Sequence, residues 1–497
     1  MFPRPLQCGD GIDVGEDRRV RIVLVSVLLL ASTLLTGYTV HNFDAFESER
    51  TPLLVGTGLL WLLFVLTLLV LRGVRGKAVV VLVLVGSVAI GGAAMVGPPN
   101  TSTDSARYAW DGIVQNAGIS PYAYAPTDER LDDLRPEWLF QEPVINQRGD
   151  AVCPGERIQR AYKDPSGDLF CSALNRSDVP TIYPPASEIF FAGVRAITGP
   201  TPQYWPLQLT GLLLSVGTTI MLLAGMARRG INLRNAAVWA WCPLVATEAI
   251  TNSHIDMLGV IFTLAAVFLV SAGRQWRGGI MLGIAIATKL IPVIAAPAML
   301  RNRGWKVIIA SIVTFALLYV PYVLATGISV LGYLPGYLSE EGYQDGSRFA
   351  LVALVAPGEA AIVVAGALLA FIAVLVFLKT DQASPWVGQL VMIGSTLLIL
   401  SPRYPWYALL LLPFIALSGR WEWLMVPLAL TLRLLVPSLE VTQVSIALAT
   451  IVIVVVSVRR AGLGATITLL RHPGRWFTPG QPVTGAASAP IERNEAR

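Results

Sequence analysis

Long apolar stretches alternate with short polar loops along most of the chain. Each stretch approaches the roughly 20 residues that a helix needs to cross a bilayer. This pattern predicts an all-α fold, that of a polytopic helical membrane protein with about 12 transmembrane spans. The predicted spans cover residues 22–40, 53–72, 78–96, 205–226, 235–250, 255–272, 307–325, 359–378, 385–400, 405–418, 424–437 and 441–458.

Residues 279–300 are also apolar, but they do not fit one straight span. Lys289 and Pro292 interrupt the run. Basic residues flank it on both sides, namely Arg274, Arg277, Arg301, Arg303 and Lys306. Because a straight span would place one basic cluster outside, we predict a re-entrant hairpin of two half-helices, with its irregular backbone surrounded by protein.

The loop charges orient the chain in the membrane. Arg18, Arg19 and Arg21 precede the first span, the loop HNFDAFESER after it is mostly acidic, and LRGVRGK after the second span is basic. Basic loops favour the cytoplasm. We therefore expect cytoplasmic N- and C-termini in a multi-pass plasma-membrane protein. Four regions follow: residues 1–96 with three spans, an extracytoplasmic segment 97–203, a bundle 204–458, and a basic, mostly disordered tail 459–497.

Composition agrees with this class. The chain is 54% hydrophobic and only 14% charged, with a mean hydropathy of +0.62, whereas soluble domains are about one quarter charged. Its net charge of +5 arises from Arg and Lys in loops between spans, so it does not indicate a nucleic-acid partner.

The external segment begins with a polar helix. Its five polar side chains share one helical face, namely Asp104, Arg107, Tyr108, Asp111 and Gln115. Thr103 is a candidate N-cap, and Gly118 and Pro121 are stop signals. Cys153 and Cys171 share this segment, and a disulfide between them is expected if the segment is extracytoplasmic; two free thiols are the alternative.

On this topology, further polar residues converge at the outer ends of the spans. They are Tyr183, Glu188, Asn252, His254, Asp256, Glu340, Glu341, Asp345, Arg348, Arg403, Tyr404 and Tyr407. No metal-ligand spacing, glycine-rich phosphate loop or nucleophile elbow accompanies them. With no nucleotide site, a glycosyl donor would have to arrive activated in another way.

Each candidate also has a simpler explanation. Asp104 is a candidate general base, because desolvation raises the proton affinity of a carboxylate, or else an exposed residue at a helix start. Asp111 could orient substrate hydroxyls or simply pair with Arg107. His254, with Asp256 nearby, could bind a phosphate or a sugar hydroxyl, or be an interfacial residue.

Three cations remain to be assigned. Arg403 could clamp a phosphate or anchor the membrane interface. Lys289 and Arg433 lie in apolar context, which suggests function, with snorkelling to the surface as the alternative.

The motifs themselves resemble a known family. DSARYAWDGIVQNAGISPYAYAPTD, LDDLR, Asn146, TIYPPASEIFF, NSHIDMLGV, GIAIATKLIPVIAAPAML and SPRYPWYALLLLP resemble segments of the membrane-embedded GT-C glycosyltransferases of actinobacterial cell envelopes. The resemblance is strongest to polyprenyl-phosphate-mannose-dependent α-mannosyltransferases and covers about residues 95–420.

The resemblance implies an extracytoplasmic active site, a lipid-linked sugar donor, and a lipid or polysaccharide acceptor. It also implies that Asp104 is the base of a single displacement that inverts the anomeric carbon. Arg403, with His254 or Arg348, would stabilise the leaving phosphate, and Tyr122 and Tyr183 would contact sugar faces. Arg107, Tyr108, Asp111 and Asp256 complete the expected substrate-binding set; no metal or other cofactor is expected.

Two other classes of function remain open. A sugar-lipid transporter or flippase would use Lys289 and Arg433 to line a path and would form no glycosidic bond. A non-catalytic envelope assembly protein would use segment 97–203 to bind partners, and would tolerate substitution of Asp104 and Arg403.

Overall fold

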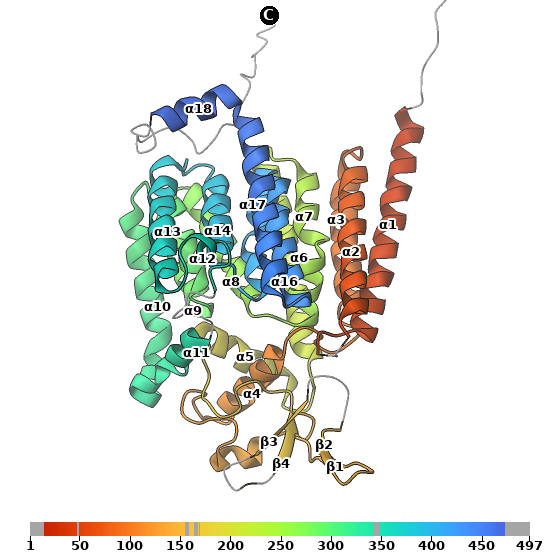
Figure 1. The fold of residues 1–497 in the computed structure, drawn as a ribbon, viewed down its shortest axis with the longest axis vertical. Helices are drawn as coiled ribbons and strands as arrows, with labels where there is room; N and C mark the ends of the chain where they lie inside the picture. Colours follow the sequence, from red (N-terminus) through yellow and green to blue (C-terminus); the bar gives the residue numbers. More distant parts are fainter. Residues whose placement is uncertain are drawn as a thin grey trace, which may run out of the picture.

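The computed structural model describes residues 14–46, 49–154, 159–163, 167, 169–340 and 348–472. Within these residues a bundle of helices lies against a smaller layer formed by segment 97–203, which we call the cap (Figure 1). The described chain is mostly helical with few strands, as the predicted fold class requires. The predicted disordered tail 459–497 is helical where it is described, in the end of α17 Leu439–Ala461 and in α18 Leu463–Arg471, and its residues 473–497 lie outside the described residues.

Three apolar helices open the chain. They are α1 Val14–Asn42, α2 Thr51–Leu71 and α3 Lys77–Ala93. The first two exceed the length of a bilayer crossing, and α1 packs against both others. Gly76, with φ +72°, makes the turn before α3, a conformation that other residues rarely adopt.

The remaining bundle helices vary widely in length. They are α6 Trp205–Arg228, α7 Ala237–Ala240, α8 Asp256–Ser271, α9 Gln275–Thr288, α10 Gly304–Thr326, α11 Leu334–Glu340, α12 Val352–Val355, α13 Glu359–Lys379, α14 Trp386–Leu400, α15 Leu412–Ser418, α16 Met425–Leu435, α17 Leu439–Ala461 and α18 Leu463–Arg471. Short 3₁₀ helices join several of them, namely η2 Leu233–Ala236, η4 Ile291–Ala295, η5 Pro297–Met299, η6 Gly327–Leu331, η7 Pro405–Leu410 and η8 Trp421–Leu424.

Six described helices are long and apolar enough to cross a membrane, so the predicted count of 12 is not confirmed. Several predicted spans exist as shorter or broken elements. The predicted span 235–250 consists of η2, α7 and a π-helical turn, η3 Val245–Thr251, and η3 meets α8 at a bend of 112°. The predicted spans 385–400 and 424–437 form α14 and α16, which are 15 and 11 residues long.

The chain dips and returns between α9 and α10. A methyl group at Gly279 would lie 2.6 Å from the Val307 carbonyl oxygen, and one at Gly283 would lie 2.7 Å from that of Ser311. These contacts advance in the same direction along both helices, so α9 and α10 are parallel and the chain must return between them. This geometry agrees with the predicted hairpin, except that 3₁₀ turns replace its second half-helix.

The described residues of the cap form two helices, a 3₁₀ helix and two small pairs of strands. Its elements are α4 Asp104–Asn116, η1 Glu129–Leu134, β1 Val144–Ile145, β2 Ala151–Val152, β3 Arg160–Lys163, β4 Leu169–Ser172 and α5 Pro185–Thr198. Both strand pairs are antiparallel, and Arg160 faces Ser172 in the longer one. Helices α4 and α5 pack closely, because a methyl group at Gly112 would lie 2.5 Å from the Phe191 carbonyl oxygen. Cys153 and Cys171 are joined by a disulfide, the pairing that the sequence suggested.

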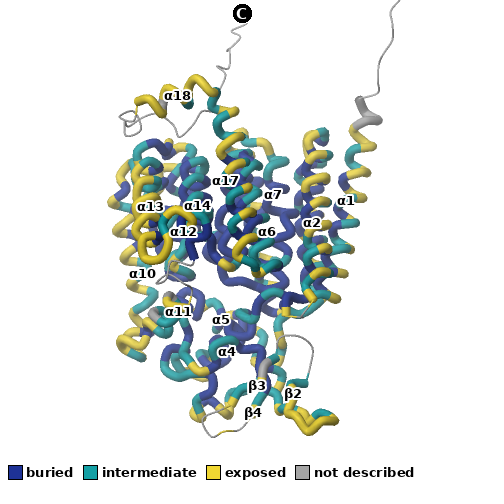
Figure 2. Tube along the Cα trace, in the orientation of Figure 1, coloured by how far each residue is buried: buried dark blue, intermediate teal, exposed yellow. Residues whose placement is uncertain are grey.

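The cap and α18 lie at opposite ends of the molecule (Figure 1). Buried residues run through the centre of the bundle and into α4 and α5, whereas the outer helices carry exposed bands (Figure 2). Many exposed side chains on α1, α10 and α13 are large and apolar, including Leu34, Leu317 and Val363. Such surfaces are suited to lipid, not to water.

Candidate active site

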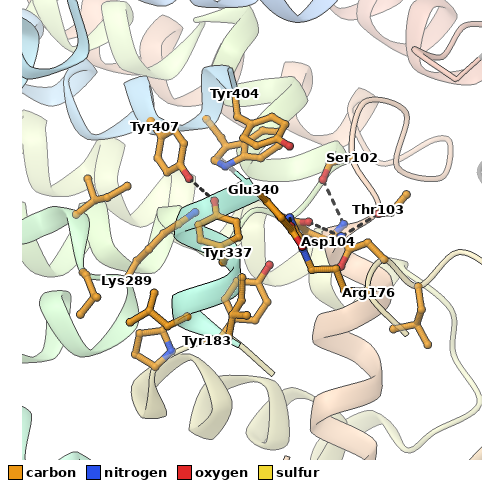
Figure 3. Close-up of a pocket in the computed structure, with 18 of the residues that line it drawn as sticks. Ser102, Thr103, Asp104, Arg176, Tyr183, Lys289, Tyr337, Glu340, Tyr404 and Tyr407 are labelled. Atoms are coloured by element: carbon orange, nitrogen blue, oxygen red, sulfur yellow. Dashed lines mark hydrogen bonds and ion pairs between the residues drawn. The ribbon is translucent and has the colours of Figure 1, made fainter. Parts of the chain in front are cut away.

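A cavity of about 730 Å³ lies between the cap and the bundle. Its walls come from segments far apart in the chain: residues 101–104 and 173–176 of the cap, 289–294 after α9, the α10–α11 region, and 404–407. Apolar and aromatic side chains form most of the lining, and a few charged groups converge within it (Figure 3). Small-molecule sites commonly have this composition.

Asp104 is the first residue of α4 and lies on the cavity wall. Asn175 donates a hydrogen bond of 2.8 Å to its Oδ1. Its Oδ2 is 3.6 Å from Nδ1 of His254, and its side chain is 16% exposed. Burial raises the pKa of the Asp104 carboxyl above its ordinary value, while the Lys289 ammonium and the hydrogen bond from Asn175 oppose that rise. A carboxylate of this kind can accept a proton.

Asn252 holds the loop that leads to Asp104. Its Oδ1 accepts hydrogen bonds from the backbone N–H groups of Asn100, Thr101 and Ser102, at 3.0, 3.0 and 3.3 Å. Asn252 is completely buried and lies at the bend between η3 and α8. The bend in the bundle therefore positions the start of α4 in the cap. Although the sequence placed Asn252 at the outer side, it did not assign it to the site.

His254 lies in a row between two carboxylates. Its Nε2 is 3.2 Å from Oε2 of Glu248, and its Nδ1 faces Asp104. Its ring stacks on Trp406, with 3.8 Å between the ring centroids. Glu248 was missed by sequence reasoning, although an acidic residue inside an apolar run is a recognised functional signal.

Three cations are found among the described residues that line the cavity: Arg176, Lys289 and Arg348. Lys289 ends α9, at the point where the chain turns back, and its ammonium donates a hydrogen bond of 2.6 Å to Asp256. The same ammonium lies 4.7 Å from the centroid of the Tyr407 ring. Asp256 therefore positions Lys289 without lining the cavity itself.

Arg176 forms part of a contact between the cap and α11. It lies beside Asp104 in Figure 3, and its guanidinium bonds to Oε2 of Glu340 at 2.9 Å. Tyr333 donates a hydrogen bond of 2.6 Å to the other oxygen of Glu340. The sequence did not assign Arg176 to the site, because its neighbours in the chain give no signal.

Seven of the nine predicted substrate-binding residues do not line this cavity, namely His254, Asp256, Arg403 and four residues of the cap. These four are Arg107, Tyr108, Asp111 and Tyr122. Their side chains are buried in the cap. Arg107 and Asp111 form an ion pair with each other at 2.8 Å, which was the simpler explanation for Asp111. The hydroxyl of Tyr122 donates a hydrogen bond to the Tyr183 carbonyl. Tyr183 does line the cavity, as predicted.

Behind this wall lies a pair of buried carboxyl groups. Thr181 donates a hydrogen bond of 2.8 Å to Glu188. Burial raises the pKa of Glu188 well above its ordinary value, and the charge of Asp111 raises it further. Burial also raises the pKa of Asp111, against the opposing charge of Arg107. Desolvation in the cap thus favours the protonated form of both carboxyl groups.

Arg403 is exposed and lies outside the lining of the cavity. The same SPRYPWY segment contributes Tyr404, Trp406 and Tyr407 instead, and its first residue, Ser401, adopts a left-handed conformation. The cavity wall thus receives the aromatic part of the motif and not its guanidinium. Arg348 does line the cavity and is buried. Glu341 and Asp345 lie outside the described residues.

The structure thus has a helical bundle of membrane-spanning composition and a partly buried carboxylate in a largely apolar cavity. Comparison with known proteins adds a match to a family model. Residues 181–402 match the model of Glycosyltransferase family 87. This range includes His254, Lys289 and Arg348, whereas Asp104 precedes it.

Two curated relatives are also glycosyltransferases by name. An "Alpha-(1->3)-arabinofuranosyltransferase" of Mycobacterium tuberculosis is 26% identical over 242 residues, covering 44% of this chain and 53% of the relative. A "Polyprenol-phosphate-mannose-dependent alpha-(1-2)-phosphatidylinositol pentamannoside mannosyltransferase" of Mycolicibacterium smegmatis is 25% identical over 165 residues, covering 33% of this chain and 37% of the relative. The chain spans about half the length, or less, of these relatives. No solved structure matches it.

The family match and these relatives support a glycosyltransferase of the GT-C type. The family-level resemblance noted in the motifs is confirmed. The two relatives differ in the sugar that their names specify, so the preference for mannose is not confirmed.

Proposed function

We propose that the protein transfers a sugar, mannose in the first instance, from a polyprenyl-phosphate donor to a glycolipid or polysaccharide of the cell envelope. The observation that carries this proposal is the cavity in which Asp104 lies near Arg176 and Lys289. A carboxylate and nearby cations are the groups that an attack on a sugar phosphate requires. The names of the two relatives support mannose and arabinofuranose as donor sugars.

In the proposed reaction, Asp104 accepts the proton of an acceptor hydroxyl as its oxygen attacks the anomeric carbon. The bond between that carbon and the donor phosphate breaks, and polyprenyl phosphate leaves with the bonding electrons on the opposite face. A single displacement inverts the anomeric configuration. Lys289 and Arg348 would stabilise the negative charge of the leaving phosphate, and Arg176 would do so after release from Glu340.

The apolar wall offers a place for the polyprenyl chain. Leu290 and Val293 line the cavity beyond Lys289 and are 40% and 50% exposed. The phosphate would then lie beside Lys289 and the chain would pass outward between helices. Trp406 and Tyr407 face the cavity and would contact the sugar.

We further propose that the cap lies outside the plasma membrane and that both ends of the chain lie in the cytoplasm. Basic residues follow α2 and precede α9 and α10 at the end opposite the cap (Figure 1). Positive loops favour the cytoplasm, and a disulfide in the cap fits an oxidising compartment.

The test uses membranes that contain the protein, with radiolabelled polyprenyl-phosphate mannose, polyprenyl-phosphate arabinofuranose and envelope lipid acceptors in parallel. We expect a labelled product. Its rate of formation should fall by roughly 10² to 10⁴-fold in Asp104→Asn, which is the contribution of a general base. Asp133→Asn, which changes an exposed carboxylate of the same cap, should retain full activity.

Other outcomes would overturn the proposal. Near-normal transfer by the Asp104→Asn variant would refute the assignment of Asp104 as the general base. Movement of intact donor across vesicles with no new glycosidic bond favours a flippase. If only arabinofuranose is transferred, the proposed mechanism stands and arabinofuranose replaces mannose as the proposed donor sugar.

A further inference from the structure

Two adjoining cavities lie at the end of the bundle opposite the cap. One of about 460 Å³ lies near the end of α2, η8 and the end of α17, and one of about 350 Å³ lies beside the start of α3. Both are lined by Asn232 and Arg234, so they meet at the start of η2. We call them the basal cavities. Neither has a role in the proposed transfer.

The basal cavities are strongly cationic. Five basic residues line them, namely Arg72, Arg75, Lys77, Arg234 and Arg460. The lining contains one carboxylate, that of Glu422, which is 3.0 Å from the Arg460 guanidinium. Four positive charges are therefore not neutralised within the lining, and an anion would be attracted to it.

Two of these guanidinium groups are held in place by groups other than carboxylates. Arg72 lies over the ring of Trp421, with its guanidinium carbon 4.5 Å from the ring centroid. Nε of Arg234 donates a hydrogen bond of 2.6 Å to the Val74 carbonyl. Within the described part of the chain, neither forms an ion pair. Fixed guanidinium groups are suited to phosphate, because their planar N–H groups match its oxygens.

The floor of the basal cavities is apolar. Leu68 and Leu71 of α2 line the larger cavity, and Val79 and Val80 of α3 line the smaller one. The bias of basic residues toward the cytoplasmic side explains why cations lie at this end of the molecule. It does not explain why they surround two connected cavities with an apolar floor.

We propose that the basal cavities bind the phosphate headgroup of an anionic membrane lipid. The cations would contact the phosphate at the level where the helices end, and the leucines would contact the first part of the lipid chain. Because both cavities share Arg234, a lipid with two phosphates can occupy both at once. Basic pockets between membrane helices are known to bind such headgroups.

The test uses the purified full-length protein, by native mass spectrometry and by thermal unfolding in detergent, with three added lipids: cardiolipin, phosphatidylglycerol and phosphatidylcholine. We expect cardiolipin to bind most tightly and to stabilise the protein most, and phosphatidylglycerol to do so less. Phosphatidylcholine should neither bind nor stabilise. The double variant Arg72→Gln/Arg234→Gln should bind cardiolipin at least tenfold more weakly. The control Arg228→Gln/Arg459→Gln removes two exposed cations that do not line the cavities, and should bind normally.

A second variant covers the case in which the first fails to fold. Arg75→Gln/Lys77→Gln changes two exposed residues on the rim of the smaller cavity and should weaken cardiolipin more than phosphatidylglycerol. Equal binding by the cavity and control variants would overturn the proposal, as would equal stabilisation by phosphatidylcholine. Stabilisation by inorganic phosphate at the concentrations at which lipid acts would also overturn it, in favour of a soluble phosphate ligand.

Discussion

Replacement of Arg107 by methionine should destabilise the cap strongly. The Arg107 and Asp111 side chains are only 4% and 2% exposed, and they pair at 2.8 Å. Arg107 also donates hydrogen bonds to the carbonyls of Arg176 and Val179, at 3.2 and 3.1 Å. Methionine has an unbranched apolar chain and no donor, so it would leave a buried carboxylate without its cation and two carbonyls without these hydrogen bonds.

The magnitude follows from these contacts. Removing one partner of a buried ion pair costs about 3–5 kcal/mol. Each carbonyl left without its donor adds roughly 1 kcal/mol or more. We therefore expect Arg107→Met to lower the free energy of unfolding by about 5–7 kcal/mol. The double variant Arg107→Met/Asp111→Leu also removes the buried charge and should recover more than half of that loss.

The loss should depend on pH in a defined direction. Burial raises the pKa of Asp111 and Arg107 opposes that rise, so the pKa of Asp111 is higher still in Arg107→Met. A group with a raised pKa in the folded state contributes stability that is lost as the pH rises through that pKa. Arg107→Met should therefore be less destabilised at about pH 5 than at about pH 8.

The assay is denaturant unfolding of the purified protein in micelles, followed by tryptophan fluorescence at both pH values. Trp110 on α4 lies in the affected region. A loss below about 1 kcal/mol in Arg107→Met, as for a surface pair, would refute the reasoning. So would a double variant that is as unstable as the single one.

Three further predictions concern Asp104, the loop before it and the disulfide. In Asn175→Ala, Asp104 loses a hydrogen bond that lowers its pKa, so the acid limb of the proposed transfer activity should move to higher pH. Full activity should return at high pH; an unchanged limb would contradict this role. Asn252→Ala removes the acceptor for three backbone N–H groups and should lower kcat at least tenfold with little change in KM. Asn252→Asp keeps the accepting oxygen and should retain most of the kcat of the unsubstituted protein. Cys171→Ser opens a disulfide that links positions 18 residues apart and should cost about 3 kcal/mol in cap stability, and a reductant should reproduce this loss only in the unsubstituted protein.

The polar helix of the cap was predictable because its signals are local. The sequence predicted a helix from Asp104 to residue 117, and the structure has α4 at Asp104–Asn116. Gly118, with φ +81°, follows it as a stop signal. Thr103 occupies the N-cap position, but its hydroxyl accepts a hydrogen bond from Asn175 and does not cap the helix. Local patterns specify the element, and residues remote in sequence decide what its side chains contact.

The orientation of the polar face of α4 was not predictable. Periodicity groups Arg107, Asp111 and Gln115 on one face, and it cannot say whether that face meets substrate or protein. In the structure their partners include residues about 70 positions away, among them Glu188, whose carbonyl accepts from Gln115. A polar face satisfied in this way looks the same in the sequence as one that binds a ligand.

Glu248, which contacts His254 in the bundle, was missed for a similar reason. Glu248 lies in a run that predicts one straight span, and only the bend at the end of η3 brings it to His254. Neither the π-helical turn nor the left-handed conformation of Ser253 has a clear sequence signal. The return of the chain between α9 and α10 was easier to predict, because basic residues on both sides of 279–300 disfavour a straight crossing.

The bonds made by Asn252 have a consequence for exchanging parts between relatives. One side chain of the bundle satisfies three donors of the loop that begins the cap, and Ser187 of the cap donates to the Thr288 carbonyl at the end of α9. Segment 97–203 is therefore not an autonomous module. A chimera that exchanges the cap for that of a relative has to carry residues 248–256 and 288–289 together with it, since these residues hold the cap against the bundle.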